Sequence, residues 1–492
     1  MSQIQVSHLT FGYEGSYDNV FEDISFGIDT DWKLGFVGRN GRGKTTLFRL
    51  LMGEYPYEGR IAASVRFGYF PYPVEDETVM TYEVAAQVCS TAEDWELLRE
   101  LSLLRVDAEV LYRPFVTLSK GEQTKVLLAA LFLNEGDFLL IDEPTNHLDV
   151  HARAVVAQYL NTKKGFILIS HDRVLLDACT DHTLAINRGG IEVVSGSYSV
   201  WKENFDRQNA FELNQNERLK KELSRLKEAA TRASAWSART ESEKKGKSNA
   251  GSKIDRGFVG HKSAKMMQRA KNLEHRQQAA MEEKANLLKN VETSESLKLH
   301  PLKFHVQRLI SLKDVGIHYG DRAVCGNLSF EVQQGERICL SGGNGCGKSS
   351  TLKLILGEEI PHTGEVLVPN GLKISYVSQD TSQLCGDLSG YAWKMKIDES
   401  LFKAILRKLD FSRVQFSKDM TEFSQGQKKK VLLAASLCES AHLYLWDEPL
   451  NFVDILSREQ IEELLLEYRP TLLFVEHDLA FRQKIATKTV EL

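Results

Sequence analysis

Two glycine-rich segments with the same spacing constrain the fold of this 492-residue chain more than any other feature. They read GRNGRGKT at 38–45 and GGNGCGKS at 342–349, and each follows an apolar run and precedes a helical pattern. In this context glycines let backbone N–H groups converge on phosphate oxygens, and the start of the helix adds partial positive charge. The chain is therefore predicted to hold phosphate groups at two places.

The two segments belong to an internal repeat, seen when residues 9–172 are laid over 315–478. In both halves an aromatic residue, the glycine-rich loop, a Ser-x-Gly segment, an apolar run ending in Asp-Glu-Pro and a histidine follow in the same order. Short β-branched runs alternate with helical patterns, which is typical of parallel strands joined by helices. We predict an α/β fold with tandem domains over residues 1–200 and 301–492.

Each phosphate loop carries a lysine and a hydroxyl residue at the positions that nucleotide chemistry requires. Lys44 and Lys348 are expected to reach the β- and γ-phosphates, and the hydroxyls of Thr45 and Ser349 suit Mg²⁺. Incidental glycine loops are the alternative, but two loops in register make chance improbable. The expected loop residues are Gly38, Asn40, Gly41, Gly43, Lys44, Thr45 and Thr46, and Gly342, Asn344, Gly345, Gly347, Lys348, Ser349 and Ser350.

Paired carboxylates end a buried-strand pattern in each half, at 138–143 and 443–448. We expect Asp142 and Asp447 to orient Mg²⁺, and Glu143 and Glu448 to position the attacking water as general bases. The alternative is a pair of acids that merely cap a strand.

A histidine follows the next apolar run of each half. His171 and His477 come after FILIS and LLFVE, so each is expected at a strand end beside the γ-phosphate. A single histidine would be weak evidence, but its repeated place in the series of motifs supports a catalytic role.

The region between the halves, residues 201–300, has almost no strand signal. Apolar residues recur at steps of three, four and seven, which predicts an antiparallel helical hairpin with its tip at about 239–260. Residues 202–290 hold 21 basic and 12 acidic side chains, so the net charge is +9 there and −14 in the remainder. This charge favours a polyanionic partner; the alternative is a solvated helical face.

Composition excludes several classes of protein. No apolar stretch approaches the roughly 18 residues of a membrane span, and the N-terminus lacks the pattern of an export signal, so we expect a cytoplasmic protein without a membrane domain. The seven cysteines show no metal-ligand spacing, which predicts reduced thiols.

The chain resembles the ATP-binding cassette superfamily in the segments Leu118–Gln123 and Phe423–Gln427, each of which is followed by a helical KVLLAA run. The resemblance implies that a signature serine and glycine bind the γ-phosphate of the ATP held by the opposite half. One site would then combine Lys44, Glu143 and His171 with Ser424 and Gly426, and the other Lys348, Glu448 and His477 with Ser119 and Gly121. Tyr13 and Tyr319 look like adenine-stacking aromatics, with core packing as the alternative.

The chain resembles the ABC-F family of ribosome-associated ATPases. The resemblance rests on the segment EPTNHLD at 143–149, the segment SGSYSVW at 195–201, the two cassettes on one chain and the basic linker. The second half departs from that pattern in EPLNFVD at 448–454. In the first half Tyr72 stands where the family has the glutamine that senses metal and γ-phosphate, whereas the second half keeps Gln379. These departures resemble the antibiotic-resistance branch of Lsa- and Vga-type proteins.

The resemblance implies a monomeric ATPase that closes on two ATP molecules with Mg²⁺ and binds the E site of the bacterial 70S ribosome. Its linker would contact 23S rRNA of the 50S subunit and P-site tRNA, and would dislodge lincosamide, pleuromutilin or streptogramin A drugs. Trp236, Phe258 and Val259 would stack or wedge near the tip, or pack within the hairpin. The alternatives are a housekeeping ABC-F translation factor, a DNA-handling cassette ATPase and the ATPase subunit of a transporter.

Overall fold

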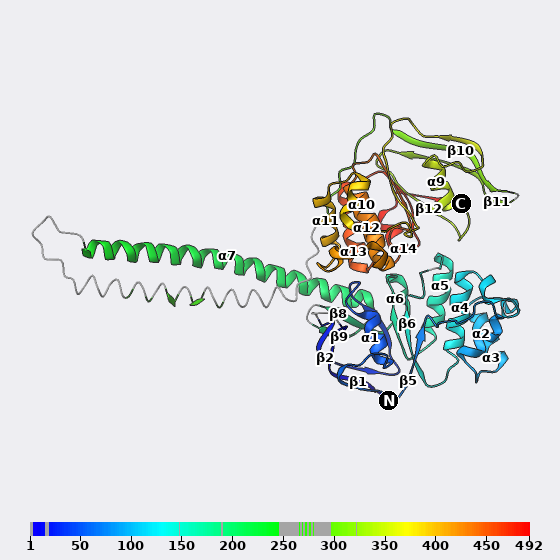
Figure 1. The fold of residues 1–492 in the computed structure, drawn as a ribbon, viewed down its shortest axis with the longest axis horizontal. Helices are drawn as coiled ribbons and strands as arrows, with labels where there is room; N and C mark the ends of the chain where they lie inside the picture. The colour runs from blue at the N-terminus through cyan, green and yellow to red at the C-terminus, as the bar shows by residue number, and fades with distance from the viewer. Residues whose placement is uncertain are drawn as a thin grey trace, which may run out of the picture. The chain divides into compact units, whose positions relative to one another are not determined.

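The computed structural model describes residues 3–14, 19–146, 148–187, 190–245, 297–320 and 322–492, together with residues 265, 268, 271, 272, 275, 276 and 279. The chain divides into two units (Figure 1). One contains both halves of the repeat, residues 1–186, 190–201 and 294–492, and the other contains residues 187–189 and 202–293.

The first half is built on a six-stranded sheet with the order β5-β6-β7-β3-β8-β9. The strands β5, β6, β7, β3 and β8 run parallel. Their buried, apolar sequences, such as FILI in β7, fit strands covered on both faces. The bounds are β3 (Lys33–Val37), β5 (Arg66–Phe70), β6 (Asp137–Asp142), β7 (Phe166–Ile169), β8 (His182–Asn187) and β9 (Gly190–Ser195).

The second half repeats this arrangement in a five-stranded sheet with the order β14-β15-β16-β12-β17, in which all pairs are parallel. The predicted α/β class and the tandem repeat are therefore confirmed. The bounds are β12 (Arg337–Ser341), β14 (Ile374–Val377), β15 (Leu443–Asp447), β16 (Leu472–Val475) and β17 (Lys488–Glu491).

Each half also has a three-stranded antiparallel sheet, with the order β2-β1-β4 in the first half and β11-β10-β13 in the second. In each half the apolar side chains of both sheets and of the helix after the phosphate loop form one core. The bounds are β1 (Gln3–Phe11), β2 (Phe21–Asp29), β4 (Glu58–Ala62), β10 (Arg308–Tyr319), β11 (Arg322–Gln333) and β13 (His362–Leu367).

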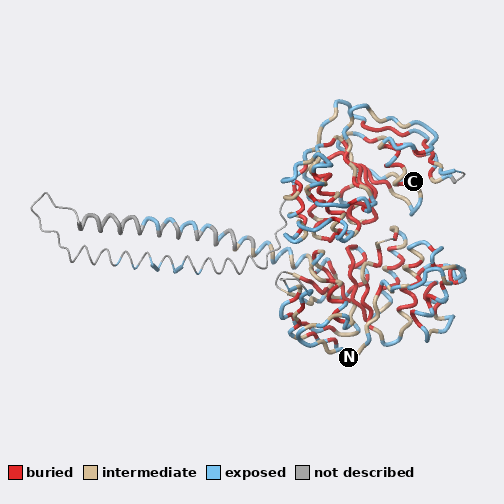
Figure 2. Tube along the Cα trace, in the orientation of Figure 1, coloured by how far each residue is buried: buried red, intermediate tan, exposed pale blue. Residues whose placement is uncertain are grey.

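The helices of the two halves correspond in the same order, and Figure 2 shows buried residues concentrated on the strands and on the helix faces that meet them. The first half has α1 (Lys44–Leu51), α2 (Thr81–Val88), α3 (Asp94–Leu103), η1 (Ala108–Tyr112), η2 (Phe115–Thr117), α4 (Lys120–Leu131), α5 (Val150–Asn161) and α6 (Arg173–Cys179). The second has α9 (Lys348–Ile355), α10 (Leu388–Met395), α11 (Glu399–Lys408), η3 (Gln415–Ser417), η4 (Met420–Glu422), α12 (Gln425–Cys438), α13 (Ile455–Tyr468) and α14 (Leu479–Ile485).

Aspartate N-caps fix where two helices begin in each half. Asp149 and Asp172 accept hydrogen bonds from backbone N–H groups at the starts of α5 and α6. Asp454 and Asp478 do the same for α13 and α14. Such caps satisfy N–H groups that the helix itself leaves unpaired, so the aspartates after the Asp-Glu-Pro and histidine motifs have a structural role.

The linker begins with one long helix, α7 (Tyr198–Lys245). Its 48 residues correspond to about 70 Å at 1.5 Å per residue. The helix continues through 239–245, where a tip loop was expected, because the charged side chains there are good helix formers and glycines begin only at Gly246.

The rest of the predicted hairpin stays a prediction. The seven described residues between 265 and 279 are helical and exposed. Phe258 and Val259 lie outside the described residues, as does the side chain of Trp236. In the described part of the chain, no helix is both long and apolar enough to cross a bilayer.

Candidate functional site

The two parallel sheets bring the predicted motifs of each half to one edge. In the first half the phosphate loop follows β3, Glu143 follows β6 and His171 follows β7, and these strands are neighbours in the order β6-β7-β3. The second half repeats this with β15, β16 and β12. Ligands of open α/β sheets bind at the carboxyl ends of the strands, so each half places its motifs where a nucleotide binds.

The residue before α1 and the residue before α9 must be glycine, because side chains from other segments lie close to their Cα atoms. Gly43 and Gly347 cap these helices with φ values of 94° and 99°. A Cβ at Gly43 would lie 2.6 Å from Val20 and 2.8 Å from Phe21. Only glycine combines this conformation with this space, which explains the spacing found in the sequence.

The two phosphate-loop lysines are buried and point back into their own loops. The Nζ atom of Lys44 donates to the carbonyl oxygens of Gly38 at 2.6 Å and Arg39 at 3.2 Å. The Nζ atom of Lys348 donates to Gly342 and Gly343 at 2.9 and 2.8 Å. Each ammonium group is therefore held at the centre of a loop whose geometry suits phosphate.

A hydroxyl and a carboxylate meet beside each loop. The Thr45 hydroxyl donates to Asp142 at 2.7 Å, and Ser349 likewise bonds Asp447. Burial raises the pKa of Asp447 to about 6, and one of its oxygens is buried without a hydrogen bond among the described residues. Hydroxyl and carboxylate oxygens are ligands that Mg²⁺ prefers. These pairs therefore fit a magnesium ion that binds together with a nucleotide.

The glutamates that follow these aspartates share a strained backbone. Glu143 and Glu448 have φ values of 51° and 46°, in the left-handed region that residues other than glycine seldom adopt. Such a backbone conformation costs energy and persists where the surrounding structure enforces it, most often at active and binding sites. The repeated conformation aims both side chains into the cavities described below.

The two glutamates nevertheless differ in environment. Burial, and next the charge of Asp142, raise the pKa of Glu143 to about 8, and neither of its side-chain oxygens has a hydrogen bond of good geometry within the described ranges. Glu448 accepts a hydrogen bond from Nε2 of Gln379 at 2.8 Å. Although burial opposes it, His477 and Gln379 lower the pKa of Glu448. Glu143 therefore keeps its proton to higher pH than an ordinary glutamate, whereas Glu448 loses its proton at lower pH.

Each histidine lies beside its glutamate. The Nε2 atom of His171 is 3.3 Å from a Glu143 oxygen, and that of His477 is 3.4 Å from a Glu448 oxygen. Burial, with Lys44 and Arg458 nearby, lowers the pKa of His171 well below its usual value. His171 is therefore neutral at physiological pH, so that one of its ring nitrogens is a hydrogen-bond donor and the other an acceptor.

The first site is a cavity of about 460 Å³ lined by both halves of the chain. The first half contributes the phosphate loop, the acids and His171, and the second half contributes the start of α12. The lining residues include Tyr13, Asn40, Gly41, Gly43, Lys44, Thr45, Thr46, Asp142, Glu143, His171, Ser424, Gln425, Gly426 and Phe452. Lys44, Glu143, His171, Ser424 and Gly426 thus line one cavity, whereas Gly38 of the expected loop residues is not among its lining residues.

The second site is a wider cavity of about 980 Å³. From the first half it takes Lys120, Asn146 and Leu148, so the expected signature residues Ser119 and Gly121 are not among its lining residues, although Lys120 between them is. Of the residues expected from the second half, Gly342 and Asp447 do not line it. Those that the second half contributes are Tyr319, Val324, Asn344, Gly345, Gly347, Lys348, Ser349, Ser350, Gln379, Gln425, Lys429, Glu448, Asn451, Phe452 and His477.

A close contact between the halves accounts for the narrow first site. The side-chain amide of Asn40 donates to the carbonyl oxygen of Phe452 at 2.8 Å. A Cβ at Gly426 would lie 2.4 Å from that oxygen and 3.0 Å from the Asn40 amide nitrogen. The signature glycine is therefore required for the phosphate loop of one half to meet the other half.

The signature serines are helix caps in this structure. Ser119 forms a capping box with Glu122 at the start of α4, and Ser424 forms one with Gln427 at the start of α12. Each helix start exposes backbone N–H groups near an anion site. Capping by itself explains the Ser-x-x-Glu/Gln spacing, and phosphate binding would be an additional role.

Tyr13 and Tyr319 are anchored by their hydroxyls rather than buried in a core. The Tyr13 hydroxyl lies 2.7 Å from Oγ1 of Thr46, and that of Tyr319 lies 3.1 Å from Oγ of Ser350. The rings are 44% and 49% exposed and line the two cavities. This exposure argues against core packing and leaves a ring face for a planar base.

Several site residues had not been expected from the sequence. The Tyr69 hydroxyl donates to Asp142 at 3.5 Å, whereas Tyr72, where the sequence resemblance implies a glutamine, does not line the first cavity. Lys429 is buried and donates to the Ser378 carbonyl at 2.9 Å beside the second cavity. A lysine inside a helix gives no signal of burial in the sequence. His147, singled out in the EPTNHLD segment, lies outside the described residues.

A scan against family models matches the family described as ABC transporter at residues 21–146 and again at 325–451. The two matches contain the phosphate loops, the signature segments and the paired carboxylates of the two halves.

The chain is also similar along most of its length to curated proteins. It is 28% identical to the ribosome protection protein VmlR of Bacillus subtilis (strain 168), over 97% of this chain and 85% of that protein. It is 26% identical to the energy-dependent translational throttle protein EttA of Escherichia coli (strain K12), over 96% and 89%. Among solved structures, the archaeal ribosome recycling factor aABCE1 in complex with stalk protein aP1 matches with a TM-score of 0.64 and 19% identity, over 98% of this chain and 87% of the other. This last likeness supports the fold alone.

The contact at Gly426 predicts unequal effects of adding one methyl group to the two signature glycines. Gly426→Ala should weaken ATP binding at the first site about tenfold or more, because the methyl group would overlap the Phe452 carbonyl. Gly121→Ala, whose methyl group would meet only a Leu148 methyl at 3.3 Å, should change the second site less than about threefold. Nucleotide titration in Lys348→Ala and Lys44→Ala backgrounds separates the sites; equal effects would contradict this account of the contact.

Proposed function

Because the chain belongs to the ABC transporter family and is an ABC-F ATPase with two cassettes, we propose that it binds two ATP molecules between its cassettes and acts on the bacterial ribosome. The observation that carries the first part is the cavity that joins the phosphate loop of the first cassette to Ser424 and Gly426 of the second. The second part is supported by the likeness to VmlR and EttA along nearly the whole chain.

In this proposal the first site combines Lys44, Glu143 and His171 with the start of α12. Lys44 binds the β- and γ-phosphates, and Glu143 takes the proton of the attacking water. Neutral His171 orients that water by accepting its hydrogen bond at one ring nitrogen, or the γ-phosphate by donating from its ring N–H. Ser424 and Gly426 offer the backbone N–H groups of a helix start to the γ-phosphate, which makes ATP a bridge between cassettes.

The second site would use the equivalent set. Lys348, Glu448 and His477 take the same roles, with Ser119 and Gly121 reaching the γ-phosphate once the wider cavity closes. Mg²⁺, held by Thr45 and Asp142 or by Ser349, Asp447 and Gln379, would neutralise charge on the phosphates. Tyr13 and Tyr319 would stack on adenine.

For the cellular role we propose ribosome protection. The ATP-closed protein would occupy the E site of the 70S ribosome as a monomer, with the basic linker against 23S rRNA of the 50S subunit and P-site tRNA. There it would dislodge lincosamide, pleuromutilin or streptogramin A drugs, and ATP hydrolysis would release it. A net basic linker gains from phosphate contacts, and α7 provides about 70 Å of reach. The likeness to VmlR, named as a ribosome protection protein, favours this role.

A housekeeping role in translation is the second candidate, favoured by the likeness to the translational throttle protein EttA. Expression in a drug-sensitive bacterium separates the two. Ribosome protection predicts growth in lincomycin, tiamulin or virginiamycin M at concentrations that stop cells carrying the Lys44→Ala, Lys348→Ala protein. If none of these drugs is tolerated better than by that control, the housekeeping role is the correct one.

Blocking hydrolysis should trap the protein on ribosomes. Replacing both Glu143 and Glu448 by Gln keeps the shape of the sites but removes the proposed bases, so the ATP-bound protein should co-sediment with 70S ribosomes. The control is the exposed pair Glu109→Gln and Glu467→Gln, which should sediment as the wild type does. Dissociation of the double active-site variant at the wild-type rate in the presence of ATP would refute release by hydrolysis.

The unequal glutamates predict different pH profiles at the two sites. A base must be ionised, and the ionised fraction of a group with a pKa of about 8 rises about tenfold between pH 7 and pH 9. ATP hydrolysis by the Glu448→Gln protein, in which the first site works alone, should therefore increase over this range. The Glu143→Gln protein should show a flat profile there, because the pKa of Glu448 is lowered. If ATP hydrolysis by the two variants changed with pH in the same way, the different pKa values of Glu143 and Glu448 in the nucleotide-free protein would not determine the hydrolysis rates.

A further inference from the structure

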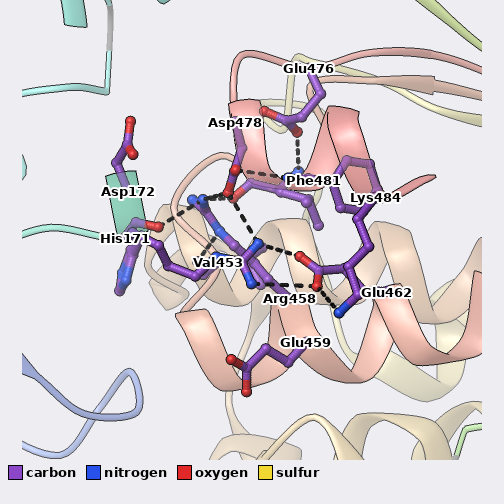
Figure 3. A network of polar contacts seen from close by, with 12 residues as sticks. His171, Asp172, Val453, Arg458, Glu459, Glu462, Glu476, Asp478, Phe481 and Lys484 are labelled. Atoms are coloured by element: carbon purple, nitrogen blue, oxygen red, sulfur yellow. Dashed lines mark hydrogen bonds and ion pairs between the residues drawn. The ribbon is translucent and has the colours of Figure 1, made fainter. Parts of the chain in front are cut away.

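A cluster of charged side chains around the buried Glu462 joins the two cassettes beside the first site (Figure 3). It consists of Arg173 at the start of α6 in the first cassette and, in the second, of Arg458 and Glu462 from α13, Asp478 at the N-cap of α14 and the exposed Lys484 from α14. We call these five residues the α6–α13 cluster. None of its members belongs to the set of catalytic and binding residues assigned above.

The central contact of the α6–α13 cluster is an ion pair between cassettes. Two guanidinium nitrogens of Arg173 donate to the two carboxylate oxygens of Glu462, whose side chain is fully buried. Lys484 donates to the same carboxylate at 2.8 Å, and Asp478 lies 3.8 Å from Arg173. A bidentate pair of this kind fixes orientation as well as distance. Although burial opposes it, bonding to Glu462 and the charge of Asp478 raise the pKa of Arg173.

A second contact ties the α6–α13 cluster to the catalytic histidine. Arg458 donates from one nitrogen to the main-chain carbonyl of His171 and to Asp478, both at 2.9 Å, and from another to the Leu450 carbonyl at 2.9 Å. His171 stands two residues before Arg173. The loop that carries the histidine of the first site is therefore held at two adjacent points by α13 of the other cassette.

The repeat shows that this ion pair exists on one side only. When the halves are laid over each other, Arg173 corresponds to Leu479, Glu462 to Ala157 and Lys484 to Ala178. Arg458 and Asp478 correspond to Arg153 and Asp172, which pair with each other inside the first cassette at 3.3 Å. The second site thus has small or apolar side chains at the three places where the first site has charges.

We propose that Arg173 and Glu462 are positioning residues for the first ATP site, holding the His171 loop against the second cassette so that hydrolysis there, but not at the second site, depends on this pair. The inference rests on the proposed roles of Glu143 and His171. Neither residue lines the cavity of the first site, so both act on it through the His171 loop. Removing either partner abolishes the bidentate contact and leaves Glu462 with Lys484 alone or Arg173 with Asp478 alone. A displacement of about 1 Å at a catalytic group lowers rates by up to about a hundredfold.

The test measures single-turnover ATP hydrolysis at each site. Arg173→Leu and Glu462→Ala introduce the residues found at the equivalent positions of the other side, and Glu462→Gln removes the charge while keeping the shape. In the Glu448→Gln background, which reports the first site, each change should lower the rate about tenfold or more. In the Glu143→Gln background the rate of the second site should change less than about twofold. Thermal unfolding of each variant shows that the protein remains folded.

A conservative variant distinguishes positioning from general packing. Arg173→Lys, which keeps a cation beside Glu462, should lose less of the first-site rate than Arg173→Leu, with the difference in kcat rather than in KM. Equal losses at both sites, losses confined to the second site, no loss at either site, or equal losses in Arg173→Lys and Arg173→Leu would each overturn the inference. If Glu143→Gln does not slow the first site at all, the proposed catalytic assignment fails instead.

Discussion

The hydrogen bond from Asn40 to the Phe452 carbonyl, made over the missing side chain of Gly426, is the constraint on which the first site depends. It brings the phosphate loop of one cassette against the signature helix of the other. Without this approach, Ser424 would cap α12 but would not line the same cavity as Lys44. The parallel sheets supply the other half of the geometry, because they end their strands at one edge.

The duplicated sites have diverged in ways that physical chemistry connects. Gln379 gives Glu448 a hydrogen-bond donor, whereas the equivalent Tyr72 does not line the first cavity and leaves Glu143 to burial and the charge of Asp142. The first site differs in a second way, because an ion pair between Arg173 and Glu462 connects it to the opposite cassette. One site is thus narrow and held by ion pairs, and the other is wide and has a glutamate that is already ionised.

Local sequence predicted the parts of this molecule that depend on local chemistry. The phosphate loops, the acids after β6 and β15 and the histidines after β7 and β16 all lie at the expected strand ends, because a buried strand followed by a polar residue has few alternative structures. Contacts between distant segments could not be predicted. Tyr69 on Asp142, Lys429 beside the second cavity and Arg173 on Glu462 depend on packing across many residues. Helix α7 extends to Lys245, into the range expected for the tip loop, because the polar residues there also favour helix.

The central claim is that each ATP is bound by both cassettes. The most direct measurement is a structure of the Glu143→Gln, Glu448→Gln protein with Mg²⁺ and ATP. The account predicts that the γ-phosphate held by Lys44 also contacts Ser424 and Gly426, and that the one held by Lys348 contacts Ser119 and Gly121. A structure in which each ATP is bound only by the cassette that supplies its phosphate loop would contradict it.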